Sequence, residues 1–312
     1  MQKNKEFNNL LPQDTTLYEN SEFVIEDKET INFYPLEKIT NKVVWGNAFN
    51  VLPKLAKESF DLIFIDPPYF LQLPKKELRR WNVNTVVEGV DDEWDKFQSF
   101  EDYDNFITKL LTLTKNLMKP NATIWVISTY HSIFRIGKIM QDLGFWILND
   151  IVWVKTNPMP NWLGVRFTNA TEHLIWAVKD KETKKYKFNK EYAKMFGIGN
   201  VGANVWFLPI CQGNERLKDK TGKKLHSTQK PIELLKRVIL TSSAEGDFIL
   251  DPMAGTGTTG FVAKELKRNF VMVELNPNYI AGIKERFTKQ FLSERNLNKN
   301  YQPHNNNLGL ML

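Results

Sequence analysis

The sequence predicts an α/β protein whose sheet is covered by helices on both faces. Short apolar runs alternate with amphipathic helical runs along the chain of 312 residues, which is the pattern of strands linked by crossover helices. Residues 60–65 and 248–250 are apolar at almost every position, as expected of strands that are buried on both faces. A turn rich in proline or glycine follows each run, so both turns fall at the ends of buried strands.

The remaining elements are predicted from the spacing of apolar residues and from turn residues. We expect an N-terminal arm at residues 1–40, a folded domain at 41–295 and a polar tail at 296–312. The expected helices are 103–117, 133–143, 231–242, 261–266 and 279–292, and the further strands are 123–128, 145–154, 173–178 and 270–273. Residues 70–100 and 156–225 lack a sustained period, and we expect irregular or inserted regions there.

Composition and charge limit the class of protein. Lys and Arg exceed Asp and Glu by 42 to 36, and the sequence pI is about 9.1, which suits a polyanionic partner such as nucleic acid. A single cysteine, Cys211, excludes an intramolecular disulfide. No apolar run approaches the length of a membrane span, and the N-terminus lacks the apolar core of a signal peptide, so we expect no membrane association and a cytoplasmic protein.

A metal site is not expected. The four histidines, at positions 131, 173, 226 and 304, are scattered and share no ligand spacing with cysteine or carboxylates. Cys211 is expected to be a small buried apolar residue.

The first segment with a chemical signature is the glycine-rich turn at residues 251–260 (Asp-Pro-Met-Ala-Gly-Thr-Gly-Thr-Thr-Gly). A buried strand that enters such a turn before a helix brings backbone N–H groups close to a ligand. The spacing is neither that of the Rossmann fingerprint nor that of a phosphate-binding loop. Glu274 ends the next strand and is placed to bind ribose hydroxyls. The pair favours a nucleoside site, although a plain strand-to-helix connection would also contain glycines.

The second segment is Asp66-Pro67-Pro68-Tyr69, directly after a buried strand. An exocyclic amino group on a base is a poor nucleophile, because its lone pair is delocalised into the ring. A carboxylate and a backbone carbonyl held side by side could accept both amino hydrogens, and the Tyr69 ring could stack on a base that has left the duplex. As a bare string of four residues the segment is weak, since Asp-Pro-Pro also occurs in ordinary strand-ending turns.

These segments resemble the catalytic and cofactor signatures of DNA amino-methyltransferases. Their order along the chain, catalytic motif first, is similar to that of the circularly permuted beta class. Residues 226–231 (His-Ser-Thr-Gln-Lys-Pro) and 45–47 (Trp-Gly-Asn) resemble two further cofactor segments of that class. Ser227, Met253 and Asn47 depart from the commonest residues at their positions. Segments across residues 42–290 resemble the adenine methyltransferases that modify GANTC, both cell-cycle-regulated and restriction-associated.

The resemblance implies a Rossmann-like, S-adenosyl-L-methionine-dependent methyltransferase fold, circularly permuted, and methyl transfer to adenine N6 in double-stranded DNA by base flipping and direct in-line transfer. The implied catalytic residues are Asp66, Pro67, Pro68 and Tyr69. The implied cofactor-binding residues are Asn47, Ala48, Asp66, His226, Thr228, Lys230, Asp251, Pro252, Gly255, Thr256, Gly257, Thr258, Thr259 and Glu274.

DNA contacts are expected from the two irregular regions, 70–100 and 156–225, which would recognise the target sequence. Arginine can bind guanine through two hydrogen bonds, and lysine, asparagine and tryptophan can contact phosphates or bases. The candidates are Arg79, Arg80, Trp94, Arg135, Lys155, Asn157, Trp162, Arg166 and Arg216. An ordinary solvated surface charge is the alternative for each basic residue.

Several alternatives remain open from the sequence. Cytosine-N4 methylation uses the same motif logic, although those enzymes more often have Ser at the position of Asp66. Methylation of RNA or of a free metabolite, and a catalytically idle DNA-binding subunit, are the others. Cytosine-C5 chemistry is disfavoured because Cys211 lacks the adjacent proline that such nucleophiles have. A homodimer and a cognate restriction endonuclease are the expected protein partners.

Overall fold

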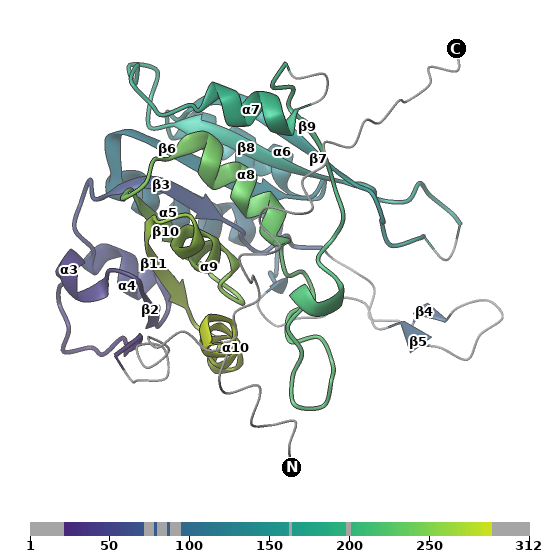
Figure 1. Cartoon of the computed structure of the whole chain (residues 1–312), viewed down its shortest axis with the longest axis horizontal. Helices are drawn as coiled ribbons and strands as arrows, with labels where there is room; N and C mark the ends of the chain where they lie inside the picture. The colour runs from purple at the N-terminus through teal and green to yellow at the C-terminus, as the bar shows by residue number, and fades with distance from the viewer. Residues whose placement is uncertain are drawn as a thin grey trace, which may run out of the picture.

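Figure 1 shows a computed structural model of the chain, which describes residues 22–71, 78–79, 86–87, 95–161, 164–197 and 201–288. A nine-stranded sheet forms its centre, with the strand order β1-β2-β11-β10-β3-β6-β8-β7-β9. Its strands are β1 (Val24–Glu26), β2 (Lys42–Trp45), β3 (Phe60–Ile65), β6 (Met118–Ser128), β7 (Trp146–Lys155), β8 (Thr171–Val178), β9 (Val205–Leu208), β10 (Phe248–Asp251) and β11 (Asn269–Glu274). Two short strands, β4 (Leu78–Arg79) and β5 (Val86–Val87), pair separately.

Helices cover both faces of the sheet, as predicted. The α-helices are α3 (Leu36–Ile39), α4 (Ala48–Val51), α5 (Phe100–Leu117), α6 (Ile133–Asp142), α7 (Lys190–Phe196), α8 (Ile232–Ser242), α9 (Thr258–Glu265) and α10 (Pro277–Thr288). In Figure 1, α8, α9 and α10 lie in front of the sheet, and α5 and α6 lie behind it. Short 3-10 turns occur at η1 (Leu52–Lys54) and η4 (Gly213–Glu215).

Successive side chains of β3 point to opposite faces of the sheet, and each face has its own hydrophobic core. Ile63 and Ile65 pack into the cluster that contains α5 and α6, whereas Leu62 and Phe64 pack into the cluster that contains α8, α9 and α10. All six residues of β3 are buried, so this strand is the central element of both cores. A strand that is buried on both faces needs apolar residues at successive positions, which is the pattern that the sequence showed.

The order of the central strands confirms the permuted arrangement. β10 pairs in parallel with β3, and β11 pairs in parallel with both β10 and β2. Segments from opposite ends of the chain are therefore neighbours, with Ile249 opposite Leu62. Because parallel strands end at the same edge, Asp66 after β3, Asp251 in β10 and Glu274 in β11 meet at one edge of the sheet.

Several elements differ from the prediction: α3, α4, α7 and β2 were not predicted, and three further strands differ in place or extent. β1 pairs with β2, so the sheet begins within the predicted arm, before residue 41. β9 pairs with β7, so the region 156–225 contributes an edge strand. β6 begins at Met118, where a turn was expected, and its register with β3 shifts between Phe60 and Leu62. Pro120 lies in this irregular stretch, where a missing N–H donor is tolerated.

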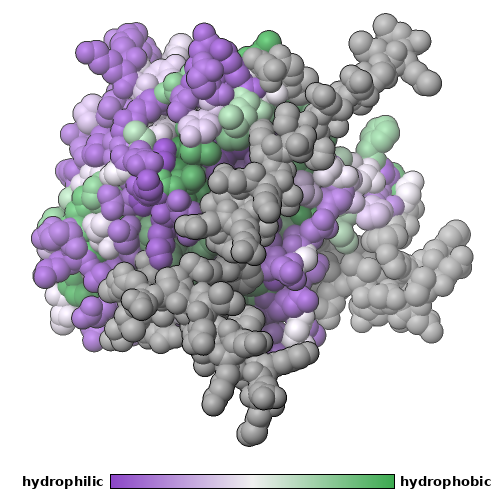
Figure 2. Space-filling view, in the orientation of Figure 1, coloured by the Kyte–Doolittle hydropathy of each residue, from purple (hydrophilic) through white to green (hydrophobic). Residues whose placement is uncertain are grey.

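The surface of the described residues is mainly hydrophilic in the view of Figure 2. Hydrophilic residues dominate the described part of the face in Figure 2, and apolar residues occur there as smaller patches. Within the described residues, no helix has both the length and the apolar character to cross a membrane, and no cluster of three His, Cys, Asp or Glu side chains could hold a metal ion. The predicted tail and residues 1–21 lie outside the described residues.

Candidate active site

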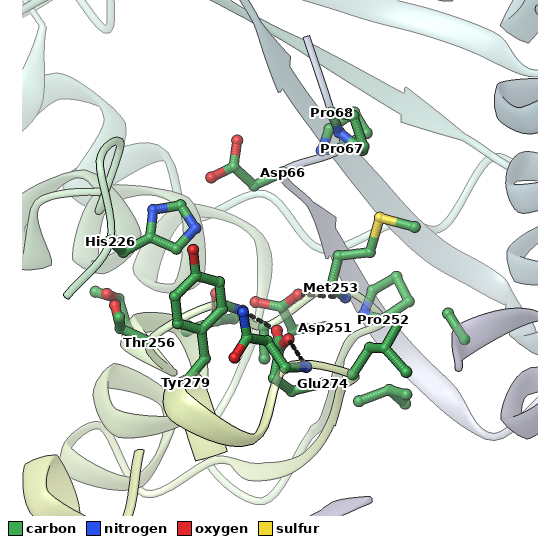
Figure 3. A pocket seen from close by; sticks show the side chains of 18 of the residues that line it. Asp66, Pro67, Pro68, His226, Asp251, Pro252, Met253, Thr256, Glu274 and Tyr279 are labelled. Atoms are coloured by element: carbon green, nitrogen blue, oxygen red, sulfur yellow. Dashed lines mark hydrogen bonds between the residues drawn. The ribbon is translucent and has the colours of Figure 1, made fainter. Parts of the chain in front are cut away.

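A pocket of about 660 Å³ opens at the edge of the sheet where the central parallel strands end. Figure 3 shows Asp66, Pro67 and Pro68 on one side of it, Asp251 and Glu274 on the opposite side, and His226 beside Tyr279. The predicted site residues that line it are Asn47, Ala48, Asp66, Pro67, Pro68, Tyr69, His226, Thr228, Lys230, Asp251, Pro252, Gly255, Thr256, Thr258, Thr259 and Glu274. The structure therefore brings together residues that are far apart in the sequence.

Gly257 is the predicted cofactor residue that does not line the pocket. It precedes α9 with φ 72°, in the left-handed region, and a Cβ atom there would lie 2.9 Å from Ile283 Cγ1. A glycine is therefore required at position 257 by the left-handed turn and by the close packing against α10.

The glycine-rich turn is held by the two carboxylates at the strand ends. Glu274 accepts hydrogen bonds from the backbone N–H groups of Gly255 and Asn276, both at 2.7 Å. Asp251 accepts one from the N–H of Met253 at 3.1 Å. Burial raises the pKa of Asp251 and of Glu274 to about 7 each. Both acids therefore favour a ligand that donates hydrogen bonds or has positive charge.

Arg286 of α10 supports the same turn from behind. Its Nε atom donates to the Thr256 carbonyl at 2.8 Å, and the side chain is almost fully buried. Burial lowers the pKa of Arg286 to about 10, against the opposing charge of Glu215. Arg286 could not be predicted from the sequence, since nothing in an amphipathic helix distinguishes a buried arginine from a solvated one.

His226 forms a neutral wall of the pocket. Its Nδ1 atom accepts a hydrogen bond from the Thr228 N–H at 3.1 Å, and its ring lies 4.7 Å from the Tyr279 ring. Burial, with the charge of Lys230 added, lowers the pKa of His226 to about 3. The imidazole is thus uncharged at neutral pH. Sequence reasoning missed Tyr279, which lines the pocket with Phe49, Phe106 and Asn276.

Asp66 follows β3 and forms an ion pair with Lys230, with 2.8 Å between Oδ2 and Nζ. Burial raises the pKa of Asp66, and the Lys230 charge opposes that change. The Lys230 Nζ atom also donates to the Thr228 carbonyl at 3.1 Å and lies 5.0 Å from the centre of the Tyr69 ring. The Asp66 carboxylate and the Tyr69 ring therefore share one cation.

Asp95 holds the backbone of the catalytic segment. Its carboxylate accepts hydrogen bonds from the N–H groups of Tyr69, Phe70 and Leu71, at 2.6, 2.6 and 2.8 Å. Phe70 has φ 51°, a left-handed conformation that such a cap stabilises. The Tyr103 hydroxyl donates to the Pro68 carbonyl at 2.9 Å. These contacts hold the backbone from Pro68 to Leu71, directly after Asp66 and Pro67.

The predicted DNA contacts are dispersed. Arg135 forms a salt bridge with Asp104, and Arg166 donates to the Tyr130 hydroxyl at 3.1 Å. Asn157 donates to Gln212. The remaining described candidates contact protein groups inside the fold, Lys155 with Glu172 and Arg216 with the Cys211 carbonyl. Arg80, Trp94, Trp162 and the side chain of Arg79 lie outside the described residues.

Comparisons with known proteins agree with this geometry. A family model described as DNA methylase matches residues 60–285. The type II methyltransferase M.HinfI of Haemophilus influenzae is 47% identical over 259 residues, which cover 83% of this chain and 70% of the relative. The type II methyltransferase M2.LlaDCHI of Lactococcus lactis subsp. cremoris is 38% identical over 253 residues, covering 81% of this chain and 91% of the relative. The crystal structure of the M1.HpyAVI–SAM complex superposes with a TM-score of 0.57 at 26% identity, covering 79% of this chain and 98% of that one.

Proposed function

The chain belongs to the N6/N4 DNA methylase family, and from this premise we propose that it methylates the N6 amino group of adenine within GANTC in double-stranded DNA. The observation on which the proposal depends is that Asp66 and Pro67 line the same pocket as the glycine-rich turn and Glu274. Adenine is favoured over cytosine N4 by Asp66, where the cytosine enzymes more often have Ser. The GANTC site is supported by the segments that resemble enzymes with that specificity.

The residues present fit S-adenosyl-L-methionine as the cofactor. A volume of about 660 Å³ lies within the range of small-molecule sites. The buried acids Asp251 and Glu274 suit ribose hydroxyls and a cationic ligand, and the apolar side chains of Phe49, Phe106 and Leu275 line the same pocket. The cofactor supplies an electrophilic methyl group on a sulfonium centre.

The chain's own residues act on the amino group of the target base. Asp66 and the Pro67 carbonyl accept hydrogen bonds from its two N–H groups, which concentrates electron density on the nitrogen that attacks the methyl group; the bond from sulfur to the methyl carbon breaks, and the methylated nitrogen then releases one proton. Tyr69 offers a ring on which an extruded base can stack. Positioning and electrostatics account for the rate in this proposal. Cys211 takes no part, because burial raises the pKa of its thiol to about 12 and the side chain faces away from solvent.

Methyl transfer from labelled S-adenosylmethionine to two matched duplexes tests the target base. We expect label in a duplex that contains one GANTC site, and none when both adenines of that site already have N6-methyl groups. Equal label in both duplexes would instead favour cytosine N4 or another sequence. Absence of label from both would favour an RNA substrate or a catalytically idle subunit.

Cofactor affinity should depend on pH through Glu274. Its pKa is about 7 in the folded protein, against an ordinary value of 4.5, so the carboxylate ionises as pH rises through neutrality. Ribose hydroxyls donate to the ionised form, so the affinity for S-adenosylmethionine should rise about tenfold between about pH 6 and pH 8. The same shift makes the free protein less stable as pH rises from the ordinary pKa to about 7, because the folded state holds a proton that the unfolded state releases.

Calorimetric titration of the wild type and of Glu274→Gln checks this expectation. The variant should bind the cofactor more weakly and with a smaller pH dependence, while DNA affinity is retained. Glu191→Gln, at an exposed position in α7, is the matched control and should behave as the wild type. An affinity of the wild type that does not change with pH would remove Glu274 from the ribose site.

We further propose that the regions 70–100 and 156–225 recognise the target sequence. The loop between β7 and β8 contains Arg166 and the exposed side chains of Val165 and Phe167, and it follows strands that end at the pocket edge. A homodimer and a cognate restriction endonuclease acting on the same site remain predictions.

A further inference from the structure

Four charged side chains of alternating sign form a largely buried row that begins at the pocket. Asp66 contacts Lys230 at 2.8 Å, Lys230 lies 3.9 Å from Glu172, and Glu172 contacts Lys155 at 3.0 Å. The side chains are between 6% and 20% exposed. The row thus extends from the proposed methyl-transfer site into β7 and β8.

Glu172 is the member with the most partners. Its Oε1 atom pairs with Lys155, and its Oε2 atom accepts a hydrogen bond from the Tyr69 hydroxyl at 3.0 Å. Lys155 is brought to it by the antiparallel register, in which Trp153 is opposite Glu172. Although burial opposes ionisation, the charges of Lys230 and Lys155 lower the pKa of Glu172 below its ordinary value. Glu172 is therefore an ionised carboxylate with Lys155 at one oxygen and the Tyr69 hydroxyl at the other.

Such a row is not needed for folding alone. A buried ion pair seldom contributes more stability than apolar residues of similar volume would, since both charges lose their hydration. The sheet around it is otherwise built from apolar side chains such as Leu174 and Trp153. A function for the charges at this place is the simpler explanation.

The geometry of Lys230 suggests what that function is. Asp66 must accept hydrogen bonds from the target amine, yet its Oδ2 atom is paired with Lys230. Glu172 Oε2 lies 3.9 Å from the same ammonium, close enough to become its main partner through a small side-chain movement. Lys230 would then keep a carboxylate partner, and the Asp66 carboxylate would be free to accept hydrogen bonds from the amine.

We propose that Glu172 is a positioning residue for the target base, in that it fixes the Tyr69 ring through the phenol hydroxyl and provides Lys230 with a second partner when Asp66 engages the amine. This inference rests on the proposed function of Asp66 and Tyr69. It goes beyond that function because it assigns a role to a side chain outside the pocket lining. Lys155 contributes by keeping Glu172 ionised.

The first test compares Glu172→Gln with the wild type in methyl transfer to the GANTC duplex. The variant keeps the size and hydrogen-bonding capacity of the side chain but not its charge. We expect kcat to fall about 100-fold, the scale of a misplaced reacting group, while the Kd for S-adenosylmethionine, measured by titration, changes less than tenfold. Glu58→Gln is the matched control, because Glu58 also pairs with a lysine, Lys179, but is 54% exposed; it should retain the wild-type kcat.

The second test uses Tyr69→Phe, which removes the hydroxyl that Glu172 binds and keeps the ring. We expect kcat to fall about tenfold, as for loss of one hydrogen bond to a charged group. The double variant should be slower than Glu172→Gln alone by much less than the tenfold effect of Tyr69→Phe, because Glu172→Gln already weakens the hydrogen bond that Tyr69→Phe removes. If Glu172→Gln does not fold, as judged by its thermal melt, the Tyr69→Phe result decides by itself.

The outcomes separate this inference from the proposed function. A wild type that does not label the GANTC duplex contradicts the proposed function. A wild type that labels it, with Glu172→Gln or Tyr69→Phe equally fast, overturns the inference alone. Effects of the two changes that multiply in the double variant, or a tenfold loss of cofactor affinity without a change in kcat, overturn it as well.

Discussion

Replacing Asp66 by alanine should abolish methyl transfer while leaving the affinity for S-adenosylmethionine within a factor of ten of the wild type. The carboxylate is one of the two acceptors proposed for the target amine, and loss of one such preorganised group lowers kcat by about 10²- to 10³-fold at least. The protein should remain folded, because Lys230 keeps the Thr228 carbonyl at 3.1 Å and Glu172 at 3.9 Å as partners.

Single-turnover transfer and calorimetric titration measure the two quantities separately. Asp142→Ala is the control, since Asp142 forms an ion pair with Lys138 on the exposed surface of α6 and should change neither quantity. A loss of cofactor affinity greater than tenfold, about 1.4 kcal/mol, would mean that Asp66 serves the cofactor rather than the amine.

Asp95→Ala should both destabilise the protein and stop turnover. The change leaves the N–H groups of Tyr69, Phe70 and Leu71 without their shared acceptor, and Tyr69 and Phe70 are buried. Each buried donor that loses its partner costs about 1 kcal/mol or more, so we expect a loss of about 3 kcal/mol and a fall in Tm of roughly 5–10 °C. Turnover should stop because the backbone that positions Tyr69, directly after Asp66 and Pro67, loses its support.

Asp180→Ala is the matched control for this variant. Asp180 also accepts backbone N–H hydrogen bonds, from Glu182 at 2.9 Å and Thr183 at 3.0 Å, but it follows the end of β8 that is remote from the pocket. Its loss should change Tm by only a few degrees and leave kcat intact. A normal kcat in Asp95→Ala, measured well below its Tm, would show that the catalytic segment holds its shape without the clamp.

The central strands could be predicted because their residues are apolar at successive positions and end in distinctive turns. β3 and β10 have this property, so the placement of Asp66 and Asp251 at strand ends followed from the sequence. The three-residue strand β1 has no such signal: its pattern is partly buried and partly exposed, and it becomes a strand only through pairing with β2. Tertiary contact, rather than local preference, determines elements of this length.

The supporting residues of the site could not be predicted for a related reason. Glu172 lies between Thr171 and His173 in β8, without a motif of its own, and its pairing with Lys155 depends on the register of β7 and β8. Asp95 is 24 residues from Leu71, which it caps. The pocket residues that were predicted lie in motifs with fixed local geometry, whereas Asp95 and Glu172 are placed by contacts between distant segments.

The parallel pairing of β3 with β10 and of β2 with β11 has a consequence for folding while the chain is being synthesised. Asn41 accepts a hydrogen bond from the N–H of Phe270, 229 residues further along the chain. During synthesis, β2 and β3 are therefore made long before their partners, and the backbone N–H and C=O groups at their edges stay unpaired until β10 and β11 follow. Long-range pairing of this kind is slow and leaves strand edges open to aggregation. The pocket is complete only after β11 has been synthesised, because Glu274 comes from that strand.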